Sequence, residues 1–203
     1  METLTKVSEE EYLLLESTTF YKNEYHAGII VPIEGVPIDH CSMMTNIVGQ
    51  LGINLKHKGF IIYISRMLVK IPAYERYVYP DVIVGYGEGI FDRKKDIDVL
   101  LNPAIIIEIT SKNTNDYDRT EKLSCYITLE SLQEYWLVDS EKVHVMSYKR
   151  TLNNDWIMRM TSNINEKIKI AEAEIEVKEL YLNTVFDTEN PHKRIRKSTK
   201  NLT

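Results

Sequence analysis

The chain is poor in the residue types that mark specialised protein classes. It contains only 2 cysteines, 8 glycines and 6 prolines among its 203 residues. Cys41 and Cys125 lie far apart and form neither a disulfide framework, nor a CxxC pair, nor a zinc-ligand spacing. We therefore expect two ordinary core thiols in a reducing compartment. The low glycine and proline content excludes collagen-like and low-complexity chains.

Long apolar runs and targeting signals are also missing. The longest apolar stretches, such as Ile29–Ile33 and Ala104–Ile107, are far shorter than the roughly 18 residues of a membrane span. The first residues, Met1-Glu2-Thr3, contain no basic region followed by an apolar stretch, so they do not resemble a signal peptide. These absences predict a soluble, cytoplasmic protein with no membrane partner.

The composition is that of a globular chain with an uneven charge distribution. With 43% hydrophobic and 27% charged residues, a chain of this length fits one domain of roughly 150 residues or somewhat more. The net charge is −5, and residues 191–203 carry five cations and no acid, so residues 1–190 carry −5 − 5 = −10. We predict one domain over residues 1–190 and a basic tail over 191–203. The tail is either a disordered, solvated end, which we favour, or a contact for nucleic acid.

The order of the expected elements indicates an α/β fold. Ser8 and Glu11 form a capping box that opens a helix through about Thr18. Asp39 is expected to cap a second helix, which carries an apolar stripe at helical spacing and ends near Gly59. Extended segments are expected at 24–33, 60–64, 67–71, 77–84, 104–110, 134–138, 143–148 and 156–160, with further helices from 116 or 118 to 130 and over 178–186. This order predicts a central mixed β-sheet flanked by helices.

Two carboxylates inside apolar strands are the most informative feature. Asp81 lies in Tyr-Pro-Asp-Val-Ile-Val, and Glu108 lies in Ile-Ile-Ile-Glu-Ile. An unpaired ionised carboxylate costs several kcal/mol in such surroundings, so each needs a cation, a donor cluster or a proton. For either one alone, a salt bridge or a place at the solvent end of the strand explains it equally well. Together they fit a carboxylate pair on neighbouring strands, which is what a hard divalent cation such as Mg²⁺ requires.

The same residues resemble the motif of a known protein family. Pro80-Asp81, then Glu108-Ile109-Thr110 and a lysine-bearing helix, resembles the PD-(D/E)xK nuclease signature, which is short and degenerate. The longer block over residues 108–139, which includes Glu121-Lys122 and Glu134-Tyr-Trp-Leu-Val-Asp, resembles the bacterial restriction endonuclease-like family that is abundant in cyanobacteria. The resemblance spans about residues 8–186. It implies a restriction-endonuclease-like core, with Asp81 and Glu108 as ligands of Mg²⁺ or Mn²⁺.

The signature lysine is the point where this chain departs from the pattern. Two residues after Glu108 the chain has Thr110. The family commonly supplies the lysine from the following helix, and Lys122 is the matching residue, with Lys112 as the local competitor. The alternative for Lys122 is an i,i+4 pair with Asp118, worth only about 0.3–0.5 kcal/mol. We favour Lys122 as the catalytic lysine because its helix begins just beyond the Glu108 strand.

Two further residues match family positions at the entrance of the site. Glu24 is expected to accept a metal-bound water or to pair with Lys122, and the alternative is an ordinary exposed acid. His40 is expected either to contact a phosphate or to hold the start of its helix, and the alternative is a first-turn surface histidine.

The resemblance implies a metal-dependent endonuclease that hydrolyses phosphodiester bonds of nucleic acid, with DNA as the expected substrate. The alternative is a catalytically inactive nucleic-acid-binding or oligomer-forming module on the same fold, which the charge of −10 on residues 1–190 and Thr110 both favour. A homodimer is also expected, because a twofold partner allows a nuclease to address the second strand of DNA.

Overall fold

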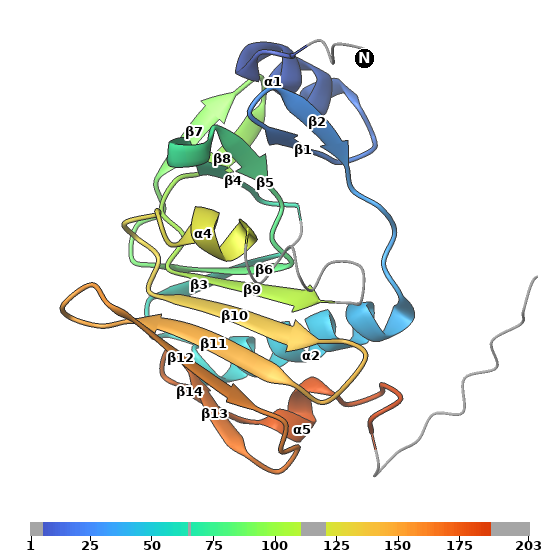
Figure 1. The fold of residues 1–203 in the computed structure, drawn as a ribbon, viewed down its shortest axis with the longest axis vertical. Helices are drawn as coiled ribbons and strands as arrows, with labels where there is room; N and C mark the ends of the chain where they lie inside the picture. Colours follow the sequence, from blue (N-terminus) through green and yellow to red (C-terminus); the bar gives the residue numbers. More distant parts are fainter. Residues whose placement is uncertain (1–5, 65, 111–120, 188–203) are drawn as a thin grey trace, which may run out of the picture.

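The computed structural model describes residues 6–64, 66–110 and 121–187. Twelve of the described strands form two six-stranded sheets, and Figure 1 shows the sheets stacked one above the other with α4 between them. Sheet A has the strand order β2-β1-β5-β4-β8-β7, and sheet B has the order β12-β11-β10-β9-β6-β3. A separate hairpin, β13–β14, completes the β structure. The mixed α/β class is confirmed, but the predicted single central sheet is two sheets.

Sheet A is antiparallel except where β4 pairs with β8. Its strands are β1 (Asn23–His26), β2 (Ile29–Pro32), β4 (Leu68–Ile71), β5 (Arg76–Val78), β7 (Phe91–Lys94) and β8 (Ile97–Leu100). Gly28, at φ +100°, lies in the turn between β1 and β2. β7 and β8 were not predicted, because β7 is charged and mostly exposed and β8 has only four residues, too few for a clear alternation.

Sheet B carries the most apolar strands. They are β3 (Phe60–Ile64), β6 (Val82–Tyr86), β9 (Ile105–Thr110), β10 (Glu134–Asp139), β11 (Val145–Arg150) and β12 (Trp156–Thr161). The β9–β10 pair is parallel and the other pairs are antiparallel. All six residues of β9 are buried, as expected for a strand that is covered on both faces.

The described helices are few, and most differ from the predicted bounds. They are α1 (Glu9–Thr18), α2 (Ile38–Asn54), α4 (Leu123–Tyr126), α5 (Val177–Leu180) and the 3₁₀ turn η1 (Pro72–Tyr74). The Ser8–Glu11 capping box of α1 is present. The prediction for Asp39 was wrong, because α2 begins one residue earlier with Pro37 as its N-cap. The predicted end at Gly59 was also wrong, since α2 ends at Asn54.

Three hydrophobic clusters hold these layers together. The first packs α2, the hairpin β13 (Lys167–Ile170) and β14 (Ala173–Glu176), and α5 against one face of sheet B. The second lies between the two sheets and includes Tyr126 of α4. The third joins α1 to sheet A. Of the cysteines, Cys125 is buried as predicted, whereas Cys41 is exposed.

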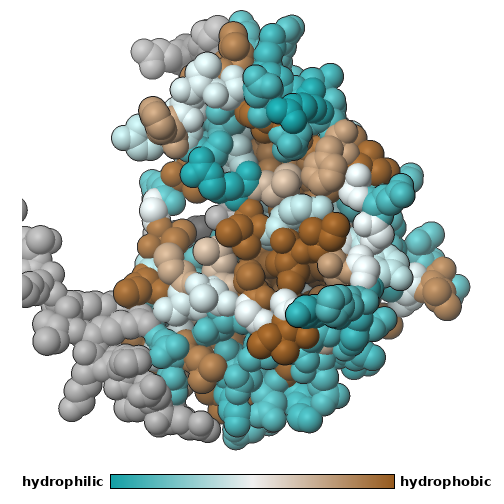
Figure 2. Space-filling model, turned by 180° about the vertical axis from the view of Figure 1, so that it is seen from behind, coloured by the Kyte–Doolittle hydropathy of each residue, from teal (hydrophilic) through white to brown (hydrophobic). Residues whose placement is uncertain are grey.

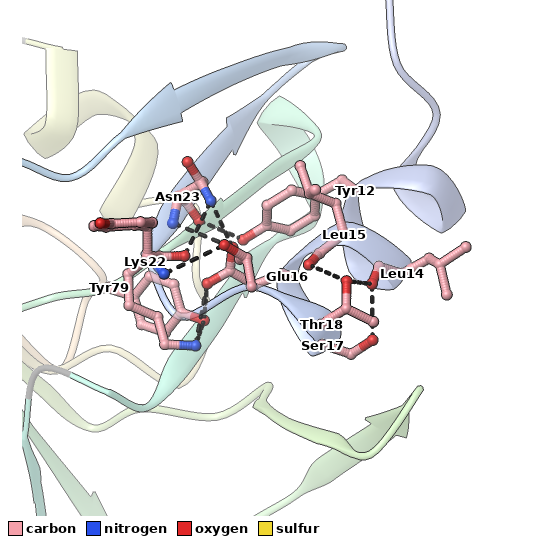
Figure 3. A network of polar contacts seen from close by, with 11 residues as sticks. Tyr12, Leu14, Leu15, Glu16, Ser17, Thr18, Lys22, Asn23 and Tyr79 are labelled. Carbon is pink, nitrogen blue, oxygen red and sulfur yellow. Dashed lines mark hydrogen bonds and ion pairs between the residues drawn. The ribbon is translucent and has the colours of Figure 1, made fainter.

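A buried carboxylate fixes α1 to sheet A. Glu16, on α1, is 1% exposed, and Figure 3 shows donors converging on it from Lys22 before β1, from Asn23 of β1 and from Tyr79 after β5. Its Oε1 accepts from Tyr79 Oη at 2.9 Å and lies 3.1 Å from Lys22 Nζ, while its Oε2 accepts from the backbone N–H and the side-chain amide of Asn23 at 3.2 and 3.1 Å. Both oxygens of Glu16 are therefore satisfied.

The chain passes between the two sheets at Pro80. The sequence predicted one interrupted strand over 77–84, whereas β5 ends at Val78 in sheet A and β6 begins at Val82 in sheet B. Pro80 lacks a backbone N–H and cannot donate to either ladder, which suits a crossing point. Among the described residues, no helix is both long enough and apolar enough to cross a membrane.

Candidate active site

Asp81 lies at the crossing from sheet A to sheet B. Its Oδ2 lies 3.1 Å from His40 Nε2 and accepts the backbone N–H of Ile109 at 2.8 Å. Its Oδ1 accepts no hydrogen bond from any residue in the described ranges, and the side chain is 16% exposed. Within the described residues, Asp81 is thus held through Oδ2 alone.

Glu108 occupies the middle of β9 and faces the space between the sheets. It is 4% exposed. Its Oε1 accepts from the hydroxyl of Tyr126 at 2.8 Å and lies 3.0 Å from the ammonium of Lys122. Burial, together with the negative charge of Glu108, raises the pKa of Tyr126 well above its usual value, so Tyr126 remains a neutral donor. Both of these donors reach the same oxygen.

The strand register brings the two carboxylates to one end of the β6–β9 pair. Val82 lies opposite Ile107 and Ile83 lies opposite Ile106, so one further step along the ladder sets Asp81 opposite Glu108. Residues that face each other across an antiparallel pair point to the same side of the sheet. The predicted placement of the two acids on neighbouring strands therefore agrees with the register.

Glu24 reaches the same region from sheet A. It is 8% exposed, so the alternative of an ordinary exposed acid was wrong. Its Oε2 lies 2.9 Å from His26 Nε2, and its Oε1 accepts the backbone N–H of Tyr79 at 3.1 Å. Burial opposes ionisation of Glu24, but His26, Lys122 and the Tyr79 N–H outweigh it and hold its pKa below the usual value. The predicted pairing with Lys122 is therefore long-range attraction, and the close partners are His26 and Tyr79.

His40 lies in the first turn of α2 and is 6% exposed. The alternative of a surface histidine was wrong, because the ring is buried against Asp81. Its Nε2 contacts Asp81, while its buried Nδ1 finds no hydrogen-bond partner in the described part of the chain. The structure therefore ties His40 to the carboxylate of Asp81.

Lys122 comes directly before α4 and is turned toward Glu108. Its side chain is 16% exposed, and the carboxylate 3.0 Å away is 5% exposed. The two competing possibilities, Lys112 and an i,i+4 pair with Asp118, lie outside the described residues. Of the six residues proposed from the sequence, the structure gathers five: Glu24, His40, Asp81, Glu108 and Lys122.

Sequence reasoning missed the roles of two tyrosines. Tyr126 was expected only to be buried, yet its hydroxyl donates to Glu108. Tyr79 was treated as part of a strand, yet its backbone holds Glu24 and its hydroxyl holds Glu16. One signal could have indicated Tyr126, because it follows Lys122 by four residues and neighbours at that spacing share one helix face.

The donor set fits a hard divalent cation. In residues 6–64, 66–110 and 121–187, no group of three or more His, Cys, Asp and Glu side chains is placed to hold a metal ion. Mg²⁺ is bound through one or two carboxylates and keeps several waters. Asp81, with its open Oδ1, and Glu108 match that requirement.

Comparisons with known proteins agree on a family. Residues 9–177 match the model of the Uma2 family, which is described as "Putative restriction endonuclease". Two Synechocystis relatives, each an "Uncharacterized protein", are similar in sequence. The first, sll1609, is 30% identical, and the match covers 81% of this chain and 93% of the relative. The second, slr1290, is 29% identical, and the match covers 75% of this chain and 79% of the relative.

A solved structure supports the fold. The crystal structure of "a putative nuclease belonging to DUF820" from Anabaena variabilis superposes with a TM-score of 0.69 and covers 86% of this chain and 97% of its own. Its sequence identity to this chain is 19%, so the likeness bears on the fold alone.

Proposed function

This chain belongs to the Uma2 restriction endonuclease-like family, and on that premise we propose that it is a metal-dependent nuclease. Its substrate is nucleic acid, with DNA as the expected form, and Asp81 and Glu108 hold Mg²⁺ or Mn²⁺. The observation that carries the proposal is that both carboxylates lie at one end of the β6–β9 pair, where His40 and the Ile109 N–H hold Asp81 and where Tyr126 and Lys122 hold Glu108.

The bound metal would supply a water of lowered pKa and would neutralise charge on the scissile phosphate. Lys122 is the proposed catalytic lysine. Its ammonium, fixed 3.0 Å from Glu108, is suited to orient the attacking water and to stabilise the negative charge that develops on phosphate oxygens. Glu24, ionised and buried nearby, is proposed to accept a hydrogen bond from a water at the site.

A catalytically inactive binding or oligomer-forming module on the same fold is the second candidate. The charge of −10 on residues 1–190 favours it, because a folded body of that charge repels phosphate chains unless it holds cations. Thr110, which stands where the nuclease signature has lysine, favours it as well. A homodimer, in which a twofold partner addresses the second DNA strand, is part of the nuclease proposal.

Metal binding is the first test. Calorimetric titration with Mn²⁺ should show one binding event in the wild type that is lost in Asp81→Ala and in Glu108→Ala. The matched control is Glu130→Ala, which removes an exposed acid beyond α4 and should bind as the wild type does. Equal heats in all four proteins would refute the carboxylate pair as the metal site.

Cleavage is the second test and separates the two candidates. Supercoiled plasmid incubated with the protein and Mn²⁺ should be nicked or linearised, and a single-stranded RNA of similar charge serves as the competitor for substrate class. A wild type that binds Mn²⁺ at Asp81 and Glu108 but cleaves neither nucleic acid would establish the inactive module instead.

A further inference from the structure

β12 is an edge strand whose outer side is open. Within the described residues its backbone pairs with β11 alone, in a register that places Val145 opposite Thr161 and Arg150 opposite Trp156. No other backbone or side-chain hydrogen bond to the main chain of 156–161 joins it to a described residue. The N–H and C=O groups on the outer side of β12 therefore form a template for another strand.

The side chains of β12 do not protect this edge. Ile157, Met158 and Met160 are 51%, 48% and 64% exposed, and Arg159 is the only charged residue of the strand. The edge strand β7 of sheet A differs, because three of its four residues are the charged Asp92, Arg93 and Lys94. Charged side chains on an edge discourage pairing with another chain. By this comparison β12 is built to be paired.

A cavity of about 380 Å³ lies beside the open edge. It is a half-open hollow between one face of β10–β12 and the strand β13, and Trp136 forms part of its wall. Both Arg159 and Met160 line the cavity. Neighbouring residues of a strand point to opposite faces of the sheet, so a cavity that touches both must reach around the edge of β12. It lies on the face of sheet B that α2 and the β13–β14 hairpin cover, away from Glu108.

The cavity is basic although residues 1–190 are acidic. Four cations line it, Lys149, Arg159, Lys167 and Lys169, against the one acid Glu166. Lys149 is paired with Glu134 at 3.0 Å and Lys167 with Glu174 at 2.8 Å. Arg159 and Lys169 form no close ion pair with any described residue. Lys169 lies opposite Glu174 in the hairpin and attracts it at longer range, so Arg159 is the more available of the two cations.

We propose that this edge and cavity bind an extended, acidic segment of a partner protein by strand addition to β12. Main-chain hydrogen bonds supply affinity, and alternate side chains supply specificity. Every second side chain of the partner enters the cavity and is acidic, to meet Arg159 and Lys169. The intervening side chains are apolar, to cover Met158 and Met160 on the opposite face.

Charge excludes two other occupants. A second copy of β12 would bring another Arg159 to a cavity that already holds unpaired cations. Residues 191–203 of the chain carry five cations and no acid. Neither segment complements the cavity, whereas an acidic strand does.

The test uses a fluorescent eight-residue peptide of alternating valine and glutamate, measured by anisotropy with the full-length protein. A valine–lysine peptide tests charge, and a valine–glutamate peptide methylated on alternate backbone nitrogens tests strand pairing. We expect each control peptide to bind at least about 10-fold more weakly, the change that corresponds to about 1.4 kcal/mol. Arg159→Glu should reverse the preference toward the lysine peptide, and Arg93→Glu on β7 should leave it unchanged.

Three results would overturn the inference: no binding of the valine–glutamate peptide, equal binding of the methylated peptide, or an effect of Arg93→Glu as large as that of Arg159→Glu. The first would leave the edge without an acidic partner. The second would reduce the interaction to charge attraction without a strand. The third would place the peptide elsewhere on the surface. None of these depends on metal binding or on cleavage.

Discussion

Glu16 lies in a carboxylate cluster next to sheet A, whereas Glu108 and Asp81 form a carboxylate pair next to sheet B, and Glu16 and Asp81 differ in how their oxygens are used. Glu16, at 1% exposure, shares its donors between both oxygens: Tyr79 and Lys22 reach Oε1, and Asn23 reaches Oε2 twice (Figure 3). Glu108, at 4% exposure, receives Lys122 and Tyr126 on Oε1. Asp81 likewise carries two contacts on Oδ2 and none from the described residues on Oδ1.

Burial of a carboxylate does not by itself indicate a ligand site. A group whose oxygens are all satisfied by its own chain is part of the fold, since a ligand would have to displace those donors. Asp81, whose Oδ1 has no partner among the described residues, is positioned through Oδ2 and can still bind a ligand. The Glu16 cluster therefore serves as the structural reference for the Asp81–Glu108 site.

The largest expected effect separates stability from function. Glu16→Ala leaves Lys22 without its carboxylate and removes the acceptor of Tyr79 and Asn23, so we expect a loss of about 3 kcal/mol or more in the free energy of unfolding. Mn²⁺ affinity of the folded protein should not change. Urea unfolding and calorimetry on the same preparation measure both quantities. A Glu16→Ala protein that stays folded but loses Mn²⁺ would break the distinction between the two clusters.

Lys122→Met should reduce DNA cleavage by at least about 10²-fold, as the loss of one donor to a transition state does. Lys22→Met removes the lysine of the Glu16 cluster and is the matched control, which should alter stability but not the rate of the folded enzyme. Lys112→Met tests the competing lysine. A larger loss in Lys112→Met than in Lys122→Met would move the catalytic lysine to the segment after β9.

Tyr126→Phe should weaken Mn²⁺ binding by about 10-fold, because residues that hydrogen-bond to a metal ligand typically contribute about 10–100-fold to metal affinity. The hydroxyl that fixes Glu108 is lost while the ring and its packing against Tyr135, at a centroid distance of 5.2 Å, are kept. Tyr148→Phe in the same row of rings, whose hydroxyl contacts Met146, is the control. Equal affinities in the two variants would contradict a positioning role for Tyr126.

The smallest effect is a pH dependence of stability at Glu24. The pKa of Glu24 in the folded protein lies below the usual 4.5, so its ionised form stabilises the fold above that pH, and this contribution is lost as the pH falls through the lowered pKa. Glu24→Gln should be destabilised relative to the wild type at pH 7, by about 1 kcal/mol, and the difference should shrink below about pH 4.5. Urea unfolding at pH 7 and pH 4 measures it, and a constant difference would mean that charge plays no part.

Much of sheet B could be predicted from the sequence because its strands are continuous runs of apolar residues, which a short window of sequence reveals. The unbroken β-branched run of β9 identifies a strand covered on both faces, and the capping box identifies the start of α1. Sheet A was largely missed as a separate layer. Its strands are short, and a pairing such as β4 with β8 depends on residues about 30 positions apart, for which a local pattern contains no signal.

The site was predicted in part for the same reason. Asp81 and Glu108 are conspicuous because they interrupt apolar strands, and the lysine was chosen through the family resemblance. His40 contacts Asp81, which lies 41 positions further along the chain, and Glu24 contacts Tyr79, which lies 55 positions further along. Only the folded chain reveals such contacts, and Glu16 was overlooked because an acid on a short helix normally faces solvent.

The crossing of the chain between its two sheets has a consequence for how the proposed nuclease activity would arise during folding. The chain changes sheets between β2 and β3, β3 and β4, β5 and β6, β6 and β7, and β8 and β9, so neither sheet is a continuous piece of sequence. Contacts between distant residues form late and slow the folding reaction. Because Glu24 comes from one sheet and Glu108 from the other, a nascent or partly unfolded chain holds an incomplete site. Cleavage competence should therefore return with the slowest phase of refolding, in a single step with the final docking of the sheets.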